Sequence, residues 1–163
     1  LYALCRETIV SLAPAAERKK VRFTLSGQSA VVVGIRQILG EIVYNLCDNA
    51  IKYNREGGTA AVSVTREEGF AVLRVKDNGI GIPEDQLGRV FERFYRVDKS
   101  HSKEVGGTGL GLSIVKHGAA YHGGTVSVES REGEGSLFTV RIPLPAEESL
   151  SPEAAPGAEK AGI

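Results

Sequence analysis

The strongest constraint on the fold is a helical pattern in RQILGEIVYNLCDNAIKYN, residues 36–54. Its apolar residues recur at intervals of three and four, which places them on one face of an α-helix. These residues are Ile38, Leu39, Ile42, Val43, Leu46, Ala50 and Ile51. One whole face of this helix is therefore expected to lie in a core.

Strand patterns on both sides of this helix predict a sheet. TAAVSVTR and FAVLRVKD alternate around EEG, and TVSVES and SLFTVRIP flank REGEG, so we expect two hairpins. VRFTLS and AVVVG predict two further short strands, and residues 1–20 and GLGLSIVKHGAAYH predict two more helices. The expected fold is α+β, a two-layer sandwich with three helices on one face of a mixed, mostly antiparallel sheet of about five strands.

Proline and glycine residues refine the expected boundaries of the helices. Pro14 removes a hydrogen bond, so it is expected to kink the first helix or to mark a new first turn. Gly123 and Gly124 are expected to end the third helix. From Ala146 onward few large apolar residues occur, which predicts one domain over residues 1–145 and a disordered tail over residues 146–163.

Length and charge limit the classes of function. A chain of 163 residues, 42% of them hydrophobic, can build one core but is short for two. Lys+Arg and Asp+Glu both number 20, so no basic excess favours nucleic-acid binding. Cys5 and Cys47 are expected to be reduced thiols rather than a disulfide, which favours a cytoplasmic setting.

No apolar run approaches the length of a membrane span, and no signal peptide is visible. The chain does not begin with Met, so we expect it to be part of a longer protein whose remainder could include a membrane segment.

Two glycine-rich segments, DNGIGIP and GGTGLGLS, indicate a ligand site. Seven of the chain's 20 glycines lie between Gly79 and Gly111, a density that suggests backbone brought close to a ligand. The second segment runs into a helix, whose free N–H groups favour phosphate. Neither G-x-x-x-x-G-K-[ST] nor G-x-G-x-x-G behind a strand is present, so a nucleotide site here would be of another kind.

The polar face of the central helix offers groups for a metal and phosphates. Asn45 and Asn49 present neutral oxygens at four-residue spacing, which suits Mg²⁺ shared with substrate phosphates. Lys52 could compensate phosphate charge, although it could equally form an i,i+4 ion pair with Asp48 on an ordinary solvated face.

Asp77 ends a strand inside DNGIGIP, which could also be a simple turn. Its carboxylate can accept a hydrogen bond from the exocyclic amine of adenine, whereas guanine would present a carbonyl there. A buried mismatch of that kind costs roughly 1 to 3 kcal/mol, so a site built on Asp77 would prefer ATP to GTP.

Four segments resemble, in order, the boxes of the catalytic ATP-binding domain of sensor histidine kinases. YNLCDNAIKYN resembles the N box, DNGIGIP the G1 box, FERFYRVD the F box and GGTGLGLSIV the G2 box. SREGEGSLFTVRIPLP closes the domain as in that family, and the resemblance covers about residue 1 to Pro145. It implies the Bergerat ATP-binding fold, shared with gyrase and with the heat-shock and mismatch-repair ATPases.

The resemblance implies an ATP site with Mg²⁺, and it assigns roles residue by residue. Asn45 and Asn49 would hold Mg²⁺, and Lys52 and Arg96 would be the catalytic residues, with Arg96 stabilising charge on the transferring phosphoryl group. The ATP-binding residues that it implies are Asn45, Asn49, Lys52, Tyr53, Asp77, Gly79, Gly81, Ile82, Tyr95, Arg96, Thr108, Gly109, Leu110, Gly111 and Leu112. Phe91 and Phe94 would pack at the hinge of a lid made of about residues 96–108.

Several positions depart from that family or play no part in its chemistry. Ile35 replaces a usual aspartate and is expected to alter a helix cap, and Gly118 is expected to weaken the third helix by roughly 1 kcal/mol. Glu41 stands where the wider superfamily carries a water-activating glutamate, but in kinases the nucleophile is a histidine on another domain. His101, His117 and His122 are expected to be surface or helix-end residues, since none has the context of a phosphate acceptor.

The expected function is that of a histidine-kinase catalytic domain, which passes the γ-phosphoryl group of Mg-ATP to a histidine of a separate dimerisation domain. A response regulator would receive it later. The fragment is expected to be a monomer, and the full-length protein a homodimeric bacterial membrane sensor with this domain in the cytoplasm. Two alternatives remain open: a nucleotide-holding regulatory or scaffold module, and a water-using ATPase of the same superfamily.

Overall fold

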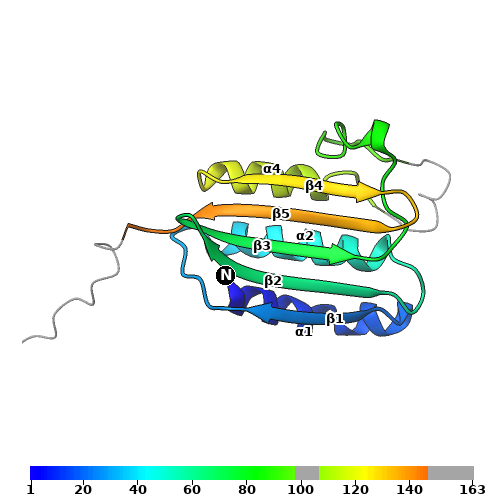
Figure 1. Ribbon diagram of the computed structural model, residues 1–163, viewed down its shortest axis with the longest axis horizontal. Coiled ribbons are helices and arrows are strands. Elements are labelled where there is room, and N and C mark those ends of the chain that lie inside the picture. Colours follow the sequence, from blue (N-terminus) through cyan, green and yellow to red (C-terminus); the bar gives the residue numbers. More distant parts are fainter. Residues whose placement is uncertain (98–106, 147–163) are drawn as a thin grey trace, which may run out of the picture.

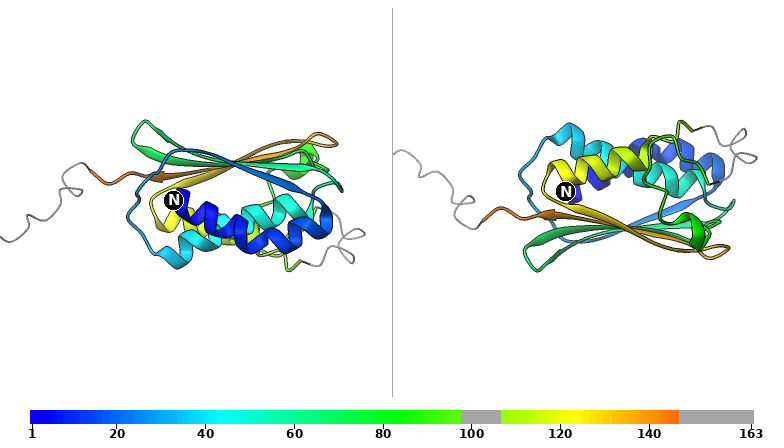
Figure 2. Two further views of the ribbon diagram at one scale, coloured as in Figure 1. Left: turned by 90° about the horizontal axis from the view of Figure 1, so that it is seen from below. Right: turned by 90° about the horizontal axis from the view of Figure 1, so that it is seen from above.

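The computed structural model describes residues 1–97 and 107–146, and these residues form a helical layer against a five-stranded sheet (Figures 1 and 2). The expected tail beyond Ala146 and residues 98–106 of the expected lid lie outside the described part. In chain order the elements are α1 (Tyr2–Lys19), β1 (Arg22–Gly27), α2 (Arg36–Lys52), β2 (Thr59–Glu67), β3 (Phe70–Asp77), the short 3₁₀ helix η1 (Glu84–Gln86), α4 (Gly111–Tyr121), β4 (Thr125–Arg131) and β5 (Gly135–Pro143).

The sheet is mixed, as expected. Its strand order is β1-β2-β3-β5-β4, with β1 parallel to β2 and every other neighbouring pair antiparallel. Figure 2 shows α1, α2 and α4 on one face of the sheet, so the two-layer α+β architecture is confirmed. The other face of the sheet carries no helix from the described residues.

The helix α2 lies between α1 and α4 and provides the centre of the core. Ile42, Val43 and Leu46 are at most 1% exposed, as the apolar pattern of the segment predicts. They pack with inward-facing residues of the sheet such as Leu73 and Val140. Burial of this face, rather than helix propensity, fixes α2 in place.

The expected hairpin turn EEG is confirmed. Glu68 has φ 49° and Gly69 has φ 82°, so both central residues adopt the left-handed conformation of a type I′ turn. This turn matches the twist of the strands that it joins and fixes the pairing of Glu67 with Phe70. The same pairing of β2 with β3 continues to Asp77 at the far end of β3, which pairs with Ala60.

The expected strand AVVVG does not form, and residues 28–35 are irregular. Pairing of β1 with β2 ends at Gly27, whose φ of 107° turns the chain away beside the Val64 carbonyl. Val31 and Val33 are 51% and 73% exposed, so no neighbouring strand realises their β propensity.

The first helix is continuous from Tyr2 to Lys19, so Pro14 does not mark a new first turn. Both cysteines are free and fully buried, as expected. Burial raises the pKa of the Cys5 thiol to about 12 and also raises that of Cys47, which makes both thiols poor nucleophiles near neutral pH.

Close packing explains why a glycine stands at position 118, which the sequence alone did not reveal. A Cβ atom at this position would lie 3.1 Å from side-chain atoms of Ile38 and Ile42 on α2. The glycine therefore allows α4 and α2 to approach closely, which offsets the cost of glycine in a helix.

An imidazole from the end of α4 binds the backbone at the start of α2. Ile35 occupies the N-cap and makes no side-chain cap bond, but its N–H donates to Nε2 of His122 over 3.0 Å. Because Nε2 accepts, the ring proton sits on Nδ1, which donates to the Gly118 carbonyl over 2.7 Å. His122 thus joins the end of α4 to the start of α2.

We expect His122→Ala to lower the free energy of unfolding by about 1 to 2 kcal/mol, because two backbone groups lose their partner. Urea denaturation at pH 7 measures the change. His117→Ala is the matched control, since the bond of that ring among the described residues is to Ser113 of its own helix. Equal losses in the two variants would show that the link between α4 and α2 contributes nothing.

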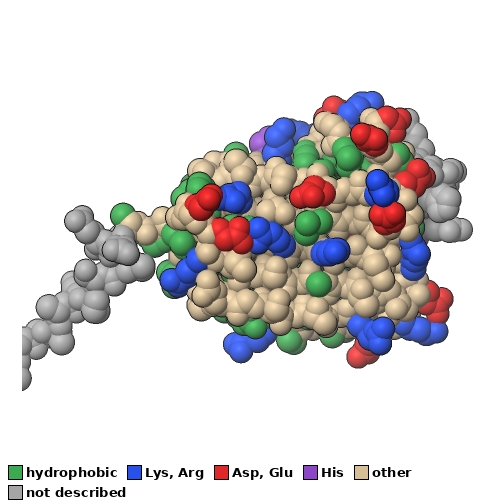
Figure 3. All heavy atoms as spheres, viewed as in Figure 1, with side chains coloured by type: hydrophobic (Ala, Val, Ile, Leu, Met, Phe, Trp, Pro, Cys, Tyr) green, Lys and Arg blue, Asp and Glu red, His purple; other side chains and the backbone are tan. Residues whose placement is uncertain are grey.

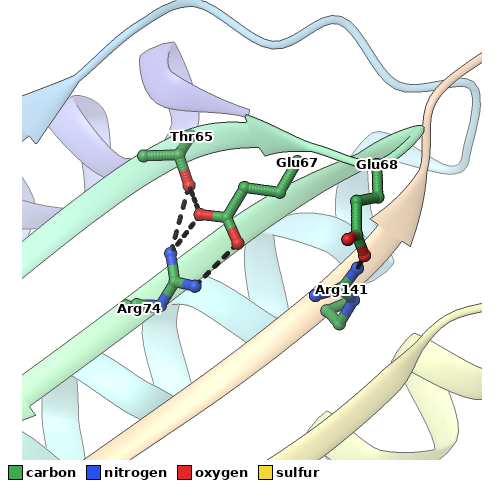
Figure 4. Close-up of polar contacts among 5 residues, drawn as sticks. All are labelled: Thr65, Glu67, Glu68, Arg74 and Arg141. Carbon is green, nitrogen blue, oxygen red and sulfur yellow. Dashed lines mark hydrogen bonds and ion pairs between the residues drawn. The ribbon is translucent and has the colours of Figure 1, made fainter.

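The open face of the sheet is polar. Figure 3 shows basic and acidic side chains interspersed over it. In Figure 4, Arg74 binds both carboxylate oxygens of Glu67 at 2.7 and 2.8 Å and also contacts Thr65 at 3.1 Å. Val72 pairs in register with Thr65 on one side and with Arg141 on the other. Its side chain is fully buried, at 0% exposure. Charged side chains therefore cover the apolar part of this face.

The Glu67–Arg74 pair is expected to stabilise the fold in a pH-dependent way. Hydrogen bonds from Arg74, and then from Thr65, lower the pKa of Glu67 from 4.5 to about 2. Because the folded pKa is the lower one, the stabilisation is complete above pH 4.5 and is lost as the pH falls toward 2. A double-mutant cycle of Glu67→Gln and Arg74→Gln, measured by urea denaturation, should give a smaller coupling energy at pH 3 than at pH 7. An unchanged coupling energy would contradict this assignment.

Candidate functional site

The segments that the sequence singled out meet at one end of the sheet, where α2 and β3 end and α4 begins (Figure 1). Tyr53, directly after α2, accepts the N–H of Ile80 over 3.0 Å. Gly111, the first residue of α4, lies against Asn45, whose Oδ1 is 2.8 Å from the position of a Cβ at Gly111. The fold thus brings the N-box, G1-box and G2-box segments together.

Asp77 is the buried acceptor at the centre of this end. It closes β3, is 8% exposed, and accepts the N–H of Gly79 on Oδ1 over 2.8 Å. The backbone N–H of Ser136 also favours the ionised form of its carboxylate. Burial raises the pKa of Asp77, and these two donors oppose that shift. The site therefore keeps a preoriented carboxylate where the strand ends.

The glycines of DNGIGIP bring protein backbones together. A Cβ at Gly79 would lie 2.2 Å from the Tyr53 carbonyl oxygen. At Gly81, with φ 68°, it would lie 2.0 Å from the Arg131 carbonyl oxygen. The sequence suggested an approach to a ligand, whereas these contacts are with the end of α2 and with the β4–β5 hairpin. Ile82 follows, and its N–H donates to Oγ of Ser130 over 2.8 Å.

The polar face of α2 carries the residues expected to meet a metal and phosphates. Lys52 and Asp48 form the i,i+4 ion pair that the sequence left open, with 2.6 Å between Nζ and Oδ2. Asn45 donates its amide N–H to the Glu41 carbonyl over 2.8 Å, which leaves its side-chain oxygen at Gly111. Asn49 is half-buried one turn later on the same face. The described residues hold no group of three or more His, Cys, Asp or Glu side chains that could bind a metal.

Of the two F-box phenylalanines, Phe91 packs on the sheet and Phe94 does not. Phe91 meets Phe138 of β5 edge to face, with ring centroids 6.3 Å apart. Phe94 is 68% exposed and has φ 63°, so the expectation that it packs at a hinge is wrong. Its backbone N–H instead donates to the Gly109 carbonyl over 2.9 Å, which joins the F box to the G2 box and turns the ring outward.

The remaining expected nucleotide contacts lie beside this junction. The Tyr95 ring is covered by the guanidinium of Arg89, 4.4 Å from the ring centroid. Arg96 and the Tyr53 hydroxyl both approach Gly107, within 3.7 and 3.9 Å of the position of a Cβ there. The other expected contacts lead into or begin α4, and they are Thr108, Gly109, Leu110, Gly111 and Leu112.

Sequence reasoning missed three residues at this end. Arg55 donates to the carbonyls of Gly79 and Gly133, and so ties DNGIGIP to the β4–β5 turn. Ser130 is the last inward-facing residue of β4, and Ser136 is the first inward-facing residue of β5. The available signal was their polarity at positions where the strand alternation calls for an apolar side chain.

The chain is similar to a known protein family. The family model described as "Histidine kinase-, DNA gyrase B-, and HSP90-like ATPase" matches residues 34–146. Sensor-like histidine kinase SenX3 of Mycolicibacterium smegmatis is 43% identical over 141 residues, which is 85% of this chain and 37% of that protein. Sensor histidine kinase RppB of Synechocystis sp. is 43% identical over 120 residues, which is 74% of this chain and 26% of that protein. The chain therefore spans well under half the length of these relatives.

Solved structures agree with this similarity. The mycobacterial sensor histidine kinase MprB is 32% identical with a TM-score of 0.72, over 85% of this chain and 93% of that one. Full-length ShkA in complex with AMPPNP is 28% identical with a TM-score of 0.75, over 88% of this chain and 30% of that one. Histidine kinase ThkA in complex with the response regulator protein TrrA is 25% identical with a TM-score of 0.72, over 89% of this chain and 40% of that one.

Proposed function

The chain belongs to the family of histidine kinase-, DNA gyrase B- and HSP90-like ATPases, and we propose that it is the ATP-binding catalytic domain, over residues 1–145, of a sensor histidine kinase. The observation that carries this proposal is Asp77. It is a buried, backbone-held carboxylate at the meeting point of the N-box, G1-box and G2-box segments. A carboxylate in that setting can accept a hydrogen bond from the exocyclic amine of adenine.

The ligands for Mg²⁺ would be Asn45 and Asn49. The side-chain oxygen of Asn45 lies against Gly111 at the start of α4, where phosphate would meet free helix N–H groups. Two amide oxygens suit Mg²⁺, which takes few protein ligands and completes its shell with water and substrate phosphates. When bound, Mg²⁺ would neutralise charge on the phosphates.

The chain's own residues would bind and orient the nucleotide. Lys52 stands on the face of α2 that carries both asparagines, and its ion pair with Asp48 holds the ammonium there. Arg96 approaches the G2-box segment near Gly107, which supports a role for its guanidinium in compensating charge on the transferring group. In the proposed reaction a neutral imidazole nitrogen attacks the γ-phosphorus. An N–P bond forms, and the P–O bond to the leaving ADP breaks.

The acceptor imidazole would belong to a dimerisation domain in the rest of the protein. A response regulator would take the phosphoryl group afterwards, by analogy with the ThkA complex. We propose a homodimeric membrane sensor as the full-length protein, from its kinship with sensor kinases. None of the described helices is long and apolar enough to cross a membrane.

Two measurements test the proposal. Calorimetric titration of the chain with AMPPNP should show binding that requires Mg²⁺, and GTP should bind more weakly. Mixing the chain with ATP and a dimerisation domain from its own protein should then give a phosphohistidine, which is labile in acid. Binding without phosphotransfer would favour the regulatory or scaffold module, and phosphate release without a partner would favour the water-using ATPase. A folded chain that binds no nucleotide would refute the proposal.

A further inference from the structure

Three polar residues form one row across the inner face of the sheet, next to the expected base site. In register, Ser130 of β4 pairs with Ser136 of β5, and Ser136 pairs with Asp77 of β3. The next inward row is apolar, because Val128, Phe138 and Val75 occupy the corresponding positions. The strands lie side by side in Figure 1. The polar row is therefore the boundary between the core and the nucleotide end of the sheet.

The hydroxyl of Ser130 has three partners at the same distance. Its oxygen lies 2.8 Å from the Gly135 carbonyl oxygen, from Oγ of Ser136 and from the backbone nitrogen of Ile82. The Ile82 N–H donates to it. Two oxygens only 2.8 Å apart need a proton between them, and a carbonyl has none to give. Ser130 must therefore donate its single proton to Gly135.

This choice fixes the direction of the next hydrogen bond. With its own proton on Gly135, Ser130 can only accept from Ser136, so the Ser136 hydroxyl donates to Ser130. Ser136 then has only lone pairs left to offer a ligand. Its neighbour Asp77 also presents carboxyl oxygens, so the row offers acceptors from both residues.

We propose that Ser130 is a positioning residue for base selection: by taking the proton of Ser136, it keeps a hydrogen-bond donor out of the base site. A base with an amine finds an acceptor in Asp77, whereas a base with a carbonyl at that place finds no donor. Without Ser130, the Ser136 hydroxyl could turn and donate to such a carbonyl. This inference rests on the proposed function, because it concerns the base that the ATP site accepts.

The test compares ATP with inosine triphosphate, which carries a carbonyl in place of the adenine amine. Calorimetric titration of the 163-residue chain with Mg²⁺ and each nucleotide gives the ratio of the two dissociation constants. We expect Ser130→Ala to reduce the preference for ATP about tenfold, as one gained or lost hydrogen bond can do. Ser130→Thr keeps the hydroxyl and should keep the preference.

Two further variants separate positioning from a general structural role. Ser136→Ala has no hydroxyl to turn, so adding Ser130→Ala to it should leave the ratio unchanged. Ser127→Ala, a serine to alanine change on the outer face of the same strand, should also leave it unchanged. If Ser130→Ala does not fold, Ser130→Cys serves instead, since a thiol is a weak acceptor and should shift the ratio in the same direction.

The outcomes are distinct. Equal weakening of both nucleotides in Ser130→Ala, with an unchanged ratio, would overturn the inference and leave the proposed function standing. A reduced preference that persists when Ser136 is also replaced would overturn it as well. If the wild-type chain bound neither nucleotide, the proposed function would fail, and the inference with it.

Discussion

Replacing Asp77 with asparagine is expected to weaken ATP binding about 100-fold while leaving the fold as stable as before, or more stable. The loss follows from hydrogen-bond polarity. The carboxylate accepts from the Gly79 N–H on Oδ1 and still has acceptor positions for the base. An asparagine has one oxygen and one NH₂ group, so a donor must face either a backbone N–H or the adenine amine. A mismatch plus a lost charge-assisted bond costs about 3 kcal/mol, which is about 100-fold in the dissociation constant.

The stability half of this prediction follows from the pKa of Asp77. Burial raises that pKa above its ordinary value, so the ionised carboxylate is less favourable in the folded state than in the unfolded state. The penalty is absent at low pH, where both states are protonated, and it is complete above the folded pKa. At pH 7 the asparagine variant avoids it. The advantage of the variant in urea denaturation should therefore shrink as the pH is lowered toward the ordinary carboxyl range.

Asp85→Asn is the matched control, because it makes the same chemical change at an exposed residue of η1. It should leave both ATP binding and stability close to those of the wild type. If Asp77→Asn instead lost stability and affinity together, the carboxylate would be a structural element of the β3 end. Retained binding would remove Asp77 from the base site altogether.

Features that depend on local sequence were predictable, and features that depend on residues far away in the chain were not. Periodic burial identified α2 and both hairpins, because the same local pattern that forms each element also creates its buried face. AVVVG failed for the opposite reason. Its valines favour a strand, but a strand needs a neighbour, and beyond Gly27 the chain leaves β2. Local propensity could not reveal where pairing stops.

The site divides in the same way. Asp77 was identifiable as a candidate because a carboxylate and two glycines at the end of a strand already restrict the chemistry. Ser130 and His122 were not identifiable, since Ser130 accepts from an N–H group 48 residues away in the chain and His122 from one 87 residues away. A serine in an alternating strand and a histidine at a helix end are both ordinary in sequence. Only the tertiary arrangement gives their hydroxyl and imidazole groups these partners.

Gly81→Ala should produce the second large effect. This variant tests whether the contact between the loop after Asp77 and the β4–β5 hairpin is needed to form the proposed base site. The alanine would adopt an unfavourable φ near 68°, and its Cβ would meet the Arg131 carbonyl oxygen at 2.0 Å. Neither backbone can move freely, because Ile82 is bonded to Ser130 and the Gly133 N–H to the Ile80 carbonyl over 2.7 Å. We expect the free energy of unfolding to fall by about 3 kcal/mol, from left-handed backbone strain and overpacking together.

Gly69→Ala separates those two contributions. Gly69 has φ 82°, but nothing lies within 4 Å of the position of its Cβ, so alanine there bears only the backbone strain of about 1 kcal/mol. The variant should bind ATP normally, whereas Gly81→Ala should lose at least tenfold in affinity, because the loop that follows Asp77 must shift away from the β4–β5 hairpin. If Gly81→Ala and Gly69→Ala had equal effects on stability and on ATP affinity, backbone conformation alone would account for the need for glycine at position 81. A larger effect at Gly81 would assign the difference to the contact between loop and hairpin, and would make that contact a condition for forming the base site.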